Sequence, residues 1–373
     1  MSNYLITLTP VDKFFFGGDM TFNVHGDTAH NEKFGTYIIA SAMFPQQTSL
    51  LGMLRFLLLS SDKSLFDGQS IIPGKSAQVT GLIGPSSFAV KNGGMDDSCF
   101  GKIQKLHRCF VRCKDSKGSV HNLDFLGFDD DVCGESEFKY KGCKGKVNGV
   151  EVTLPAIDSY DSKKGYRKFL SDDSIKKELS DVFVQDRRIG IQRNIDTGKT
   201  DDSSLFKQIS YRFNNADGCT YCFAFYLEAG CEMTPYDKRI VSVGADNSQF
   251  VLGVENVETV PQSKNTGAPH KLVLQSPAYL SREEIGLASF AFTEVIPFRF
   301  LKTDVADTEN YSVLPRYKDD KGASKMKSPT RSERYELYAP GSVFYFEDAT
   351  NYNAFVAALE AYEGFRQIGY NEY

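Results

Sequence analysis

Short apolar runs, many of them rich in Phe, Tyr, Val and Ile, recur along the chain and predict β-strands. The first run is Tyr4–Leu8, and Thr220–Leu227 begins a second half that is mostly β in character. Such residue types fit a pleated, half-buried surface. Four further strands are predicted in that half, at residues 250–252, 271–275, 290–296 and 342–346.

A longer apolar segment predicts a buried helix. Residues 50–59 are apolar nearly all round, so a helix at this position is expected to be sandwiched in the core. Pro45 lies just upstream, and either Thr48 or Ser49 is a suitable N-cap. The N-terminus of this helix would present backbone N–H groups, which bind phosphates well.

Three further elements are predicted from local signals. Residues 171–180 combine a cap residue with an acidic first turn and predict a short helix. Residues 351–363 predict an amphipathic helix that Gly364 ends as a C-cap, and residues 365–370 predict a closing strand. The apolar face of the amphipathic helix consists of Tyr352, Phe355, Val356 and Leu359.

Strand, helix, strands, helix and strand, interrupted by insertions, is the order of a ferredoxin-like α+β unit. The 373 residues are about twice what one such unit needs, so two units are expected. We place an N-terminal domain at 1–213 and a C-terminal domain at 214–373. Residues 91–165 are rich in Gly, Lys, Asp and Cys and predict an insertion in the first domain, and 301–334 form a polar, basic connector in the second.

Charge and location restrict the function. The formal net charge is −5, which argues against a protein that coats nucleic acid by bulk electrostatics, so any RNA binding must come from a local patch or be shared with partners. The N-terminus lacks the pattern of a signal peptide, and the apolar run 50–59 is too short to span a bilayer. We therefore expect a cytoplasmic protein with reduced cysteines and no membrane partner.

Metal and catalytic signals are weak. Six His and Cys residues lie in the predicted insertion, but their spacings do not match a paired zinc ribbon, and Cys219 and Cys222 lie in a predicted strand. We expect no metal, no cofactor and no catalytic residues, and we interpret the acidic run 129–131 as a solvated surface rather than a Mg²⁺ site. The six residues are His107, Cys109, Cys113, His121, Cys133 and Cys143.

The polar arm from Arg188 to Phe206 is the strongest candidate for a nucleic-acid contact. It joins two strand-like segments and carries spaced cations, an amide and a terminal aromatic, which suit a single nucleic-acid strand. A solvated surface loop is the alternative interpretation. The candidate residues of the arm are Arg188, Gln192, Arg193, Lys199 and Phe206.

A second basic patch lies at 316–334, where seven cations and three anions leave a local charge of +4. Such a patch can follow a phosphate backbone, although a disordered, solvated loop would have the same composition. Its candidate RNA-binding residues are Lys325, Lys327 and Arg331.

Several segments, in this order, resemble the RAMP proteins of CRISPR effector modules. The resemblance is greatest to the type III-B (Cmr) subunit that binds the 5′ handle of the guide RNA (crRNA). Val243–Asn247 departs from the family, which usually has a Leu-Gly-Gly-Glu-type turn there. The matching segments are 10–22, 44–55, 82–85, 188–206, 339–346 and 364–370.

The resemblance implies paired ferredoxin-like RAMP domains without nuclease activity. It also implies an assembly in antiviral defence, in which the subunit grips the crRNA 5′ handle and joins a large polymerase-like subunit to backbone RAMP subunits. In this reading the amide and hydroxyl side chains at the start of the 50–59 helix would contact bases or ribose, and a glycine turn would let the main chain approach the RNA. These added RNA-binding candidates are Gly17, Gly18, Gln46, Gln47, Thr48, Ser49 and Arg55.

Alternatives stay open at this point. Arg55 would instead neutralise a buried carboxylate in the helix packing. The chain as a whole would be a RAMP-type endoribonuclease processing precursor crRNA if His25 or His30, with a tyrosine, transferred protons. A β-rich protein-interaction module with a disordered basic connector is the third interpretation.

Overall fold

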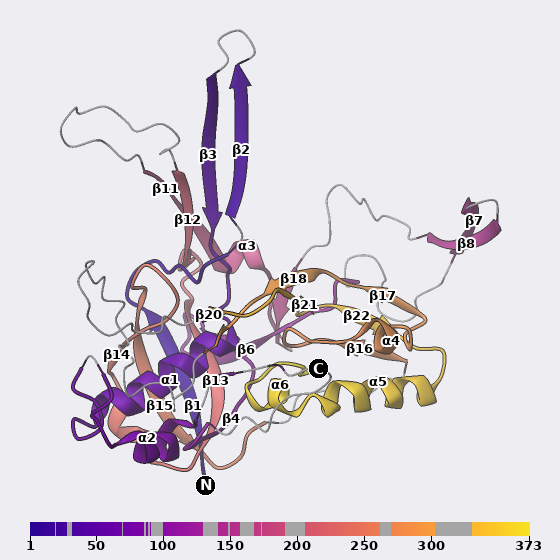
Figure 1. Ribbon diagram of the computed structural model, residues 1–373. Coiled ribbons are helices and arrows are strands. Elements are labelled where there is room, and N and C mark those ends of the chain that lie inside the picture. The colour runs from indigo at the N-terminus through magenta and orange to yellow at the C-terminus, as the bar shows by residue number, and fades with distance from the viewer. Residues whose placement is uncertain are drawn as a thin grey trace.

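The structure is a computed structural model, and the chain folds into a mixed α/β arrangement of mostly antiparallel sheets (Figure 1). In strands β2, β7 and β8, in residues 32–37 of β3 and at residue 330, only the backbone is described. The described residues are 1–18, 20–27, 32–68, 70–85, 87–88, 90, 100–129, 141–147, 150–156, 168–172, 174–190, 206–261, 270–302 and 330–373.

A nine-stranded antiparallel sheet forms the centre of the described molecule. Its strands come from distant parts of the sequence, and β1 (Ser2–Pro10) pairs with both β13 (Thr220–Ala229) and β15 (Gln249–Val257). Its other members, in spatial order, are β10 (Lys176–Glu178), β9 (Phe169–Ser171), β6 (Val120–Phe125) and β5 (Phe110–Lys114) on the side of β13, and β14 (Ile240–Ser242) beyond β15; β4 (Ile103–Leu106) also pairs with β13.

Helix α1 (Gln47–Ser61) covers one face of this sheet, and α2 (Ser76–Ile83) lies beside it. Leu50, Leu54 and Leu58 of α1 are buried in one cluster with Tyr4 of β1 and Phe223 of β13. Burying a leucine side chain contributes about 1.5–3 kcal/mol, so this face explains why a nearly all-apolar segment forms a core helix. The prediction of a buried helix over 50–59 is confirmed.

The predicted start of that helix is wrong by two residues for Thr48 and by three for Ser49. The N-cap is Gln46 rather than Thr48 or Ser49, and it makes no side-chain capping bond. The backbone carbonyl of Gln46 instead accepts the N–H groups of Ser49 at 2.9 Å and Leu50 at 3.1 Å. Local cap preference was overridden by tertiary packing at this end of the helix.

A four-stranded sheet projects from the body in the order β11-β12-β3-β2 (Figure 1). The hairpin of β2 (Met20–Asp27) and β3 (Glu32–Ala40) is antiparallel, as is the pair of β11 (Phe183–Gly190) and β12 (Phe206–Phe213). The two pairs are joined by parallel pairing of β12 with β3. We call this sheet the projecting sheet.

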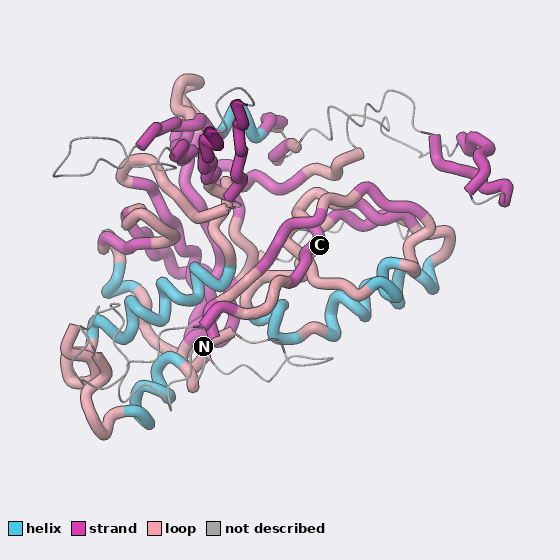
Figure 2. Tube along the Cα trace, turned by 45° about the horizontal axis from the view of Figure 1, so that its top comes forward, coloured by secondary structure: helices cyan, strands magenta, loops and turns pink. Residues whose placement is uncertain are grey.

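A C-terminal lobe contains a three-stranded antiparallel sheet of β16 (Lys271–Val273), β22 (Val343–Tyr345) and β17 (Phe290–Phe292). Helix α5 (Ala349–Ala361) runs along one side of it, as both ribbon views show (Figures 1 and 2). Phe355 and Leu359 of α5 pack against Phe344, which confirms the predicted apolar face of that helix.

The remaining elements are short. The 3₁₀ turn η1 (Thr234–Tyr236) precedes β14, and α3 (Leu179–Val182) precedes β11. In the C-terminal lobe these elements are α4 (Arg282–Ile285), α6 (Glu363–Gln367) and the strand pairs β18 (Val295–Phe298) with β21 (Tyr335–Tyr338) and β19 (Leu301–Lys302) with β20 (Thr330–Arg331); the hairpin β7 (Lys141–Val147) with β8 (Val150–Ala156) stands apart.

The predicted helix at 171–180 is wrong. The Asp172 carboxylate accepts the backbone N–H groups of Ser174 and Ile175, both at 2.9 Å, and turns the chain between β9 and β10. Asp172 therefore makes an Asx turn with the backbone two residues further on, instead of a helix cap. Only residues 179–182 are helical.

The predicted strand at 365–370 is also wrong, as is the role of Gly364 as a C-cap. Helix α5 ends at Ala361, and Gly364 lies inside the one-turn helix α6. The backbone N–H groups of Ile368 and Tyr370 both bond to the carbonyl of Phe365, and Gly369 takes a φ of +83°. These local bonds close a turn, which leaves no extended segment to pair with a sheet.

The large sheet takes strands from both sides of the predicted boundary at residue 213. Strands β13, β14 and β15 follow that residue, yet they belong to the same sheet as β1. Strands β4, β5 and β6, which fall inside the predicted insertion 91–165, lie in this sheet as well, so that part of the segment is core rather than periphery. The division into 1–213 and 214–373 stays a prediction.

None of the helices in the described part of the chain has the length and apolar character to cross a bilayer.

Candidate RNA interface

Alternation along β11 and β12 sorts the side chains of the projecting sheet onto two faces. Arg188 lies opposite Gln208, and Gly190 lies opposite Phe206. Residues directly opposite in an antiparallel pair point to the same side, as do residues two apart on one strand. Arg188 and Phe206 therefore share a face as diagonal neighbours, and we call this face the Arg188 face.

Phe206 lies over Gly190. A Cβ atom at Gly190 would come within 2.1 Å of the Phe206 ring, so the absence of a side chain is what lets the ring occupy this space. The ring nevertheless remains 40% exposed. The adjacent Arg188 side chain is 65% exposed, and its Nε lies 3.7 Å from Asp186 Oδ1. A cation and an aromatic ring are thus presented together to solvent.

The base of the projecting sheet is fixed to the body. The Lys13 ammonium donates to Asp186 Oδ1 at 3.0 Å, which partly neutralises the one carboxylate near Arg188 on β11. Phe14 and Tyr211 exchange two backbone hydrogen bonds of 2.7 and 3.0 Å. The Phe14 ring also lies 5.2 Å from that of Phe223 in the large sheet. Arg188 and Phe206 are therefore held on strands whose roots are part of the core.

The opposite face of the same strands carries Arg187, Ile189 and Lys207. Ile189 lies opposite Lys207, and Arg187 precedes it by two residues on β11. Ile189 is 74% exposed, and the Arg187 guanidinium donates to Gln185 Oε1 at 2.9 Å. Arg187 and Lys207 are not among the candidates predicted from the sequence. Alternation along a strand nevertheless predicts that Arg187 and Arg188 lie on opposite faces of the sheet.

Several predicted RNA-binding residues lie outside the described residues. These are Gln192, Arg193, Lys199, Lys325 and Lys327. Arg331 is described; it lies in β20 opposite Leu301 and is exposed. The structure thus brings together Arg188 and Phe206, and it places Arg331 in the C-terminal lobe.

The Gly17–Gly18 pair is occupied by internal packing. Gly17 has a φ of +79°, and its carbonyl accepts the N–H of Ala42 at 2.7 Å. A Cβ at Gly18 would lie 1.9 Å from the carbonyl oxygen of Ala40. Glycine is required here because another backbone segment of the same chain approaches closely.

The N-terminus of α1 packs against the C-terminal segment and the backbone of His107. The Tyr370 side chain is buried, a Cβ at the neighbouring Gly369 would lie 2.1 Å from Gln47 Nε2, and burial raises the pKa of Tyr370. Gln47 is 3% exposed, and its Nε2 donates to the His107 carbonyl at 3.0 Å. Gln47 therefore makes an internal contact in place of the expected one with RNA.

The neighbouring candidates on α1 differ in exposure. Gln46 is exposed, and its Oε1 accepts a long 3.5 Å bond from the Thr48 hydroxyl, while Ser49 is half-buried. Arg55 is half-buried, and its Nη2 donates to the carbonyl of Gly84 at 3.5 Å. Burial lowers the pKa of Arg55 to about 10, which still leaves the guanidinium charged at neutral pH. Among the described residues it has no carboxylate partner, so the alternative of a buried ion pair is not met.

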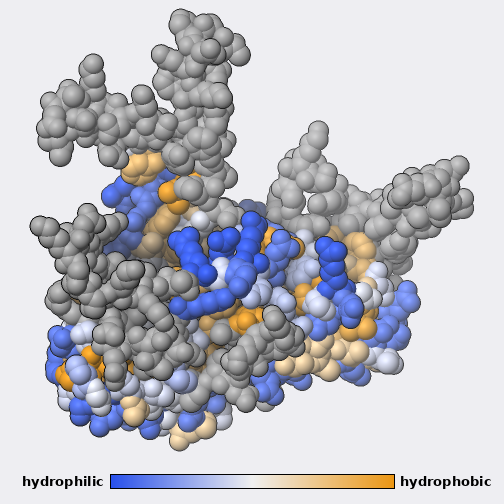
Figure 3. Space-filling view, viewed as in Figure 1, coloured by the Kyte–Doolittle hydropathy of each residue, from blue (hydrophilic) through white to orange (hydrophobic). Residues whose placement is uncertain are grey.

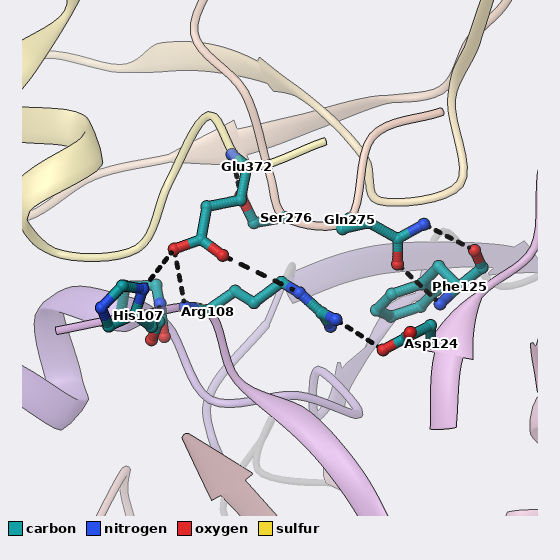
Figure 4. Close-up of polar contacts among 8 residues, drawn as sticks. His107, Arg108, Asp124, Phe125, Gln275, Ser276 and Glu372 are labelled. Carbon is teal, nitrogen blue, oxygen red and sulfur yellow. Dashed lines mark hydrogen bonds and ion pairs between the residues drawn. The ribbon is translucent and has the colours of Figure 1, made fainter. Parts of the chain in front are cut away.

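His107 and Arg108 lie in a polar seam between the large sheet and the last residues of the chain (Figure 4). His107 Nε2 is 3.0 Å from Glu228, and its Nδ1 is 3.4 Å from Glu372. Arg108 bonds to Asp124 at 2.5 Å and lies 3.8 Å from Glu372. These residues join the two parts of the molecule and show no metal-like arrangement within the described chain.

Cys109, Cys113 and Asp129 are buried in the fold. Cys109 and Cys113 are buried free thiols, and burial raises the pKa of Cys113 to about 12. Such thiols stay protonated and are poor metal ligands. Asp129 is buried rather than solvated as expected, because Lys271 and the Tyr345 hydroxyl bond to its Oδ2. The side chains of Cys133, Cys143, His25 and His30 lie outside the described residues.

The described surface in this view is mostly hydrophilic at its centre, with hydrophobic residues at the base of the projecting strands (Figure 3). A single nucleic-acid strand is held by cations along its backbone and by aromatic rings under its bases. The Arg188 face supplies one cation, Arg188, and one aromatic ring, Phe206, on strands whose base packs against the large sheet.

Comparison with solved structures shows a shared fold. One chain from a cryo-EM structure of the type III-B Cmr-beta bound to cognate target RNA matches with a TM-score of 0.50 at 14% identity, covering 99% of this chain and 95% of that chain. A chain from the same type of complex bound to target RNA and AMPPnP matches with a TM-score of 0.48 at 13% identity, with the same coverage. No curated protein matches this sequence.

A protein-family model supplies the assignment. The model described as CRISPR-associated protein (Cas_Cmr3) matches residues 152–373. That range includes the Arg188 face, strands β13 to β15 of the large sheet and the whole C-terminal lobe. Because the match extends over more than half of the sequence, this chain belongs to the Cas_Cmr3 family of CRISPR-associated proteins.

Proposed function

We propose that this chain is a non-catalytic RNA-binding and scaffolding subunit of a type III-B (Cmr) ribonucleoprotein that grips the 5′ handle of the crRNA. The observation that carries the proposal is the Arg188 face, where an exposed guanidinium lies diagonally across from an exposed aromatic ring. Membership of the Cas_Cmr3 family supports it. The likeness in fold to a chain of an RNA-bound Cmr complex is consistent with it.

In this proposal Arg188 and Phe206 contact different parts of the RNA. Arg188 contacts a backbone phosphate, and Phe206 stacks on a base, which contributes about 1–3 kcal/mol per base. Gly190 keeps the ring low against the strand, so a base approaches over a flat surface. The net charge of −5 is tolerated because the attraction is local.

The sheet order supports a ferredoxin-like unit as part of this proposal. The central strands run β5-β13-β1-β15, all antiparallel, with α1 between β1 and β5 in sequence. This is the strand order of a βαββαβ unit, with η1 between β13 and β15 where the second helix belongs. We infer a RAMP domain of this type that links the large polymerase-like subunit to the backbone RAMP subunits in antiviral defence.

The first test measures binding of a 5′-labelled crRNA to the reconstituted complex. Arg188→Ala should weaken affinity by about 10-fold and lower the slope of log K against log salt by about 0.7, because one phosphate contact is lost. Phe206→Ala should weaken affinity by about 5- to 100-fold with an unchanged salt slope, because stacking carries no net charge.

Arg299→Ala is the matched control, since Arg299 is an exposed arginine in the C-terminal lobe. It should alter affinity less than 2-fold. Equal losses in Arg188→Ala and Arg299→Ala would show that only net charge matters and would remove the Arg188 face from the interface.

The absence of catalysis is tested separately. The isolated chain is incubated with repeat RNA, and we expect no cleavage. Cleavage that disappears in His25→Ala or His30→Ala would favour the endoribonuclease alternative and overturn this part of the proposal.

A further inference from the structure

The Arg188 face also carries Gln208, whose amide is held in one orientation. Gln208 lies opposite Arg188 in the pairing of β11 with β12 and two residues from Phe206 on β12, so the three side chains share this face. The Gln208 Nε2 donates to Asp246 Oδ2. A carboxylate only accepts hydrogen bonds, so the NH₂ group faces Asp246 and the amide oxygen Oε1 is turned away from it.

Asp246 belongs to a loop that the core holds in place. The loop, residues 243–247, joins β14 to β15, and the N–H of Ala245 donates to the carbonyl of the buried Phe15 at 2.8 Å. Asp246 has a φ of +53°, a left-handed conformation that Asp tolerates better than most residues do. Because the loop is anchored through Phe15, the bond between Asp246 and Gln208 serves mainly to orient the amide.

Two acceptor oxygens are left open beside the aromatic ring of this face. Asp246 is exposed and Gln208 is half-buried. Within the described chain, no group donates to Gln208 Oε1 or to Asp246 Oδ1, and Gln208 Oε1 is not among the atoms shielded from solvent. A base that stacks on Phe206 therefore meets two acceptors from this pair at its edge.

We propose that Gln208 and Asp246 read the Watson–Crick edge of a guanine that stacks on Phe206. The inference rests on the proposed function, because the base belongs to the RNA held on the Arg188 face. Guanine has two neighbouring donors, N1–H and the N2 amino group, and these donate to the two oxygens while Arg188 stays on the backbone phosphate. The bond to the Asp246 carboxylate is charge-assisted and is the stronger of the two.

The other three RNA bases match this pair of acceptors less well. Adenine and cytosine each have one amino group next to a ring nitrogen that only accepts, and uracil has a single N–H between two carbonyl oxygens. With any of these bases, one acceptor of the base faces Gln208 Oε1 or the Asp246 carboxylate. Both groups then lose water without gaining a hydrogen bond, which is unfavourable.

The experiment places guanosine or adenosine at each nucleotide of the 5′ handle in turn and measures the affinity of the labelled crRNA for the reconstituted complex. Adenosine is also a purine and keeps the stacking surface and the phosphate, but it lacks N1–H and the N2 amino group. At one position, guanosine should bind about 10-fold or more tightly than adenosine, the discrimination expected of two well-placed contacts to a base edge.

Two variants test which residues cause this preference. Gln208→Met removes Oε1 at similar side-chain volume, and Asp246→Asn adds a donor and lets the Gln208 amide turn over. Each should reduce the guanosine-to-adenosine ratio to about 3-fold or less without weakening the binding of the adenosine crRNA, whereas a disrupted fold would weaken both. Glu347→Gln, the same loss of charge at an exposed residue of the C-terminal lobe, should leave the ratio unchanged.

The outcomes separate this inference from the proposed function. If Arg188→Ala weakens crRNA binding but no handle position prefers guanosine, the guanine site is wrong and the RNA-binding proposal stands. A preference for guanosine that persists in both Gln208→Met and Asp246→Asn also overturns the inference, since the base is then read elsewhere. If neither Arg188→Ala nor Phe206→Ala changes the affinity and no position shows a preference, both proposals are wrong.

Discussion

Asp217, an exposed residue in the turn before β13, shows how one side chain gathers several others at the end of the large sheet. Its carboxylate accepts from Lys177, from the Tyr221 hydroxyl at 2.8 Å and from the backbone N–H of Cys219 at 2.9 Å. Burial alone would raise the pKa of Asp217, but the hydrogen bonds from Lys177 and Tyr221 outweigh burial and hold the pKa far below its ordinary value. The carboxylate therefore stabilises the fold only while it is ionised.

Replacing Asp217 with Asn should lower the free energy of unfolding at pH 7 by about 1 kcal/mol or less, because the amide oxygen can still accept from Lys177 but the charge of a partly exposed ion pair is lost. A folded-state pKa below the unfolded value of about 3.9 means that this stabilisation is complete above that pH and is lost as pH falls toward the folded-state pKa. Urea unfolding at pH 7, 5 and 3 should show the wild-type advantage shrinking only at pH 3. Asp12→Asn, at an exposed carboxylate, should show no such trend.

At this scale a local pattern can select residues that the structure brings together, but it misses contacts between residues that are distant in sequence. Arg188 and Phe206 were selected from a local pattern, and register then placed them together. Gln47 was selected as a base contact, but its partner is the carbonyl of His107, sixty positions away. The sequence around Gly18 likewise does not predict its close packing on the backbone of Ala40. Such contacts depend on the fold as a whole.

At the scale of helices and strands, elements with a strong apolar face are predicted well, and short polar segments and long-range strand pairing are not. Apolar runs and periodicity identified β1, β13, α1 and α5, because each has a strong apolar face. The helix at 171–180 and the strand at 365–370 were wrong because short polar segments follow side-chain and turn bonds rather than propensity. The parallel joining of β12 to β3 could not be foreseen, since pairing between distant strands leaves no mark on either sequence.

A substitution at Gly190 tests whether the position of the Phe206 ring on the projecting sheet matters for RNA binding. Gly190→Ala places a methyl group where the Phe206 ring now lies, so the ring must rotate away, while stability changes by less than about 1 kcal/mol because the ring is already 40% exposed. Affinity for crRNA, measured by fluorescence anisotropy on the assembled complex, should fall about as far as in Phe206→Ala.

A double-mutant cycle gives the control. In the Phe206→Ala background, Gly190→Ala should have no further effect, since the two changes remove the same stacking surface. Additive losses would show that Gly190 acts on the RNA by a different route.

For the whole molecule, the seam of Figure 4 holds the large sheet to the C-terminal segment. Glu372 contacts both His107 and Arg108, and its backbone N–H donates to Ser276 at 2.8 Å. Gln275 adds two bonds to the backbone of Phe125, at 2.8 and 3.0 Å. The two parts are therefore connected by interactions that no single segment of sequence contains, and the division into 1–213 and 214–373 stays a prediction.

Replacing Gly369 with Ala tests the close packing at the seam. Gly369 has a φ of +83°, and a Cβ there would lie 2.5 Å from the backbone carbon of His107 and 2.7 Å from the nitrogen of Arg108. Gly369→Ala should destabilise the chain by about 2 kcal/mol or more, since both the strained φ and a backbone clash must be accommodated. The measurement is urea unfolding of the full chain.

Gly74→Ala is the matched control, because Gly74 has a φ of +75° with nothing within 4 Å of the position of a Cβ. It isolates the cost of the φ angle, about 1 kcal/mol. A loss in Gly369→Ala no larger than in Gly74→Ala would contradict the close packing at the seam.

The packing of the C-terminal segment against α1 has a consequence for synthesis on the ribosome. Tyr370 is made more than three hundred residues after Gln47, which at about 5–20 residues per second is a delay of roughly 15–65 s. During the first part of that interval the apolar face of the nascent α1 lacks β13 and β15, and during all of it the first turn of α1 lacks the Tyr370 side chain. The packing around α1 is therefore completed only when translation reaches the last residues of the chain.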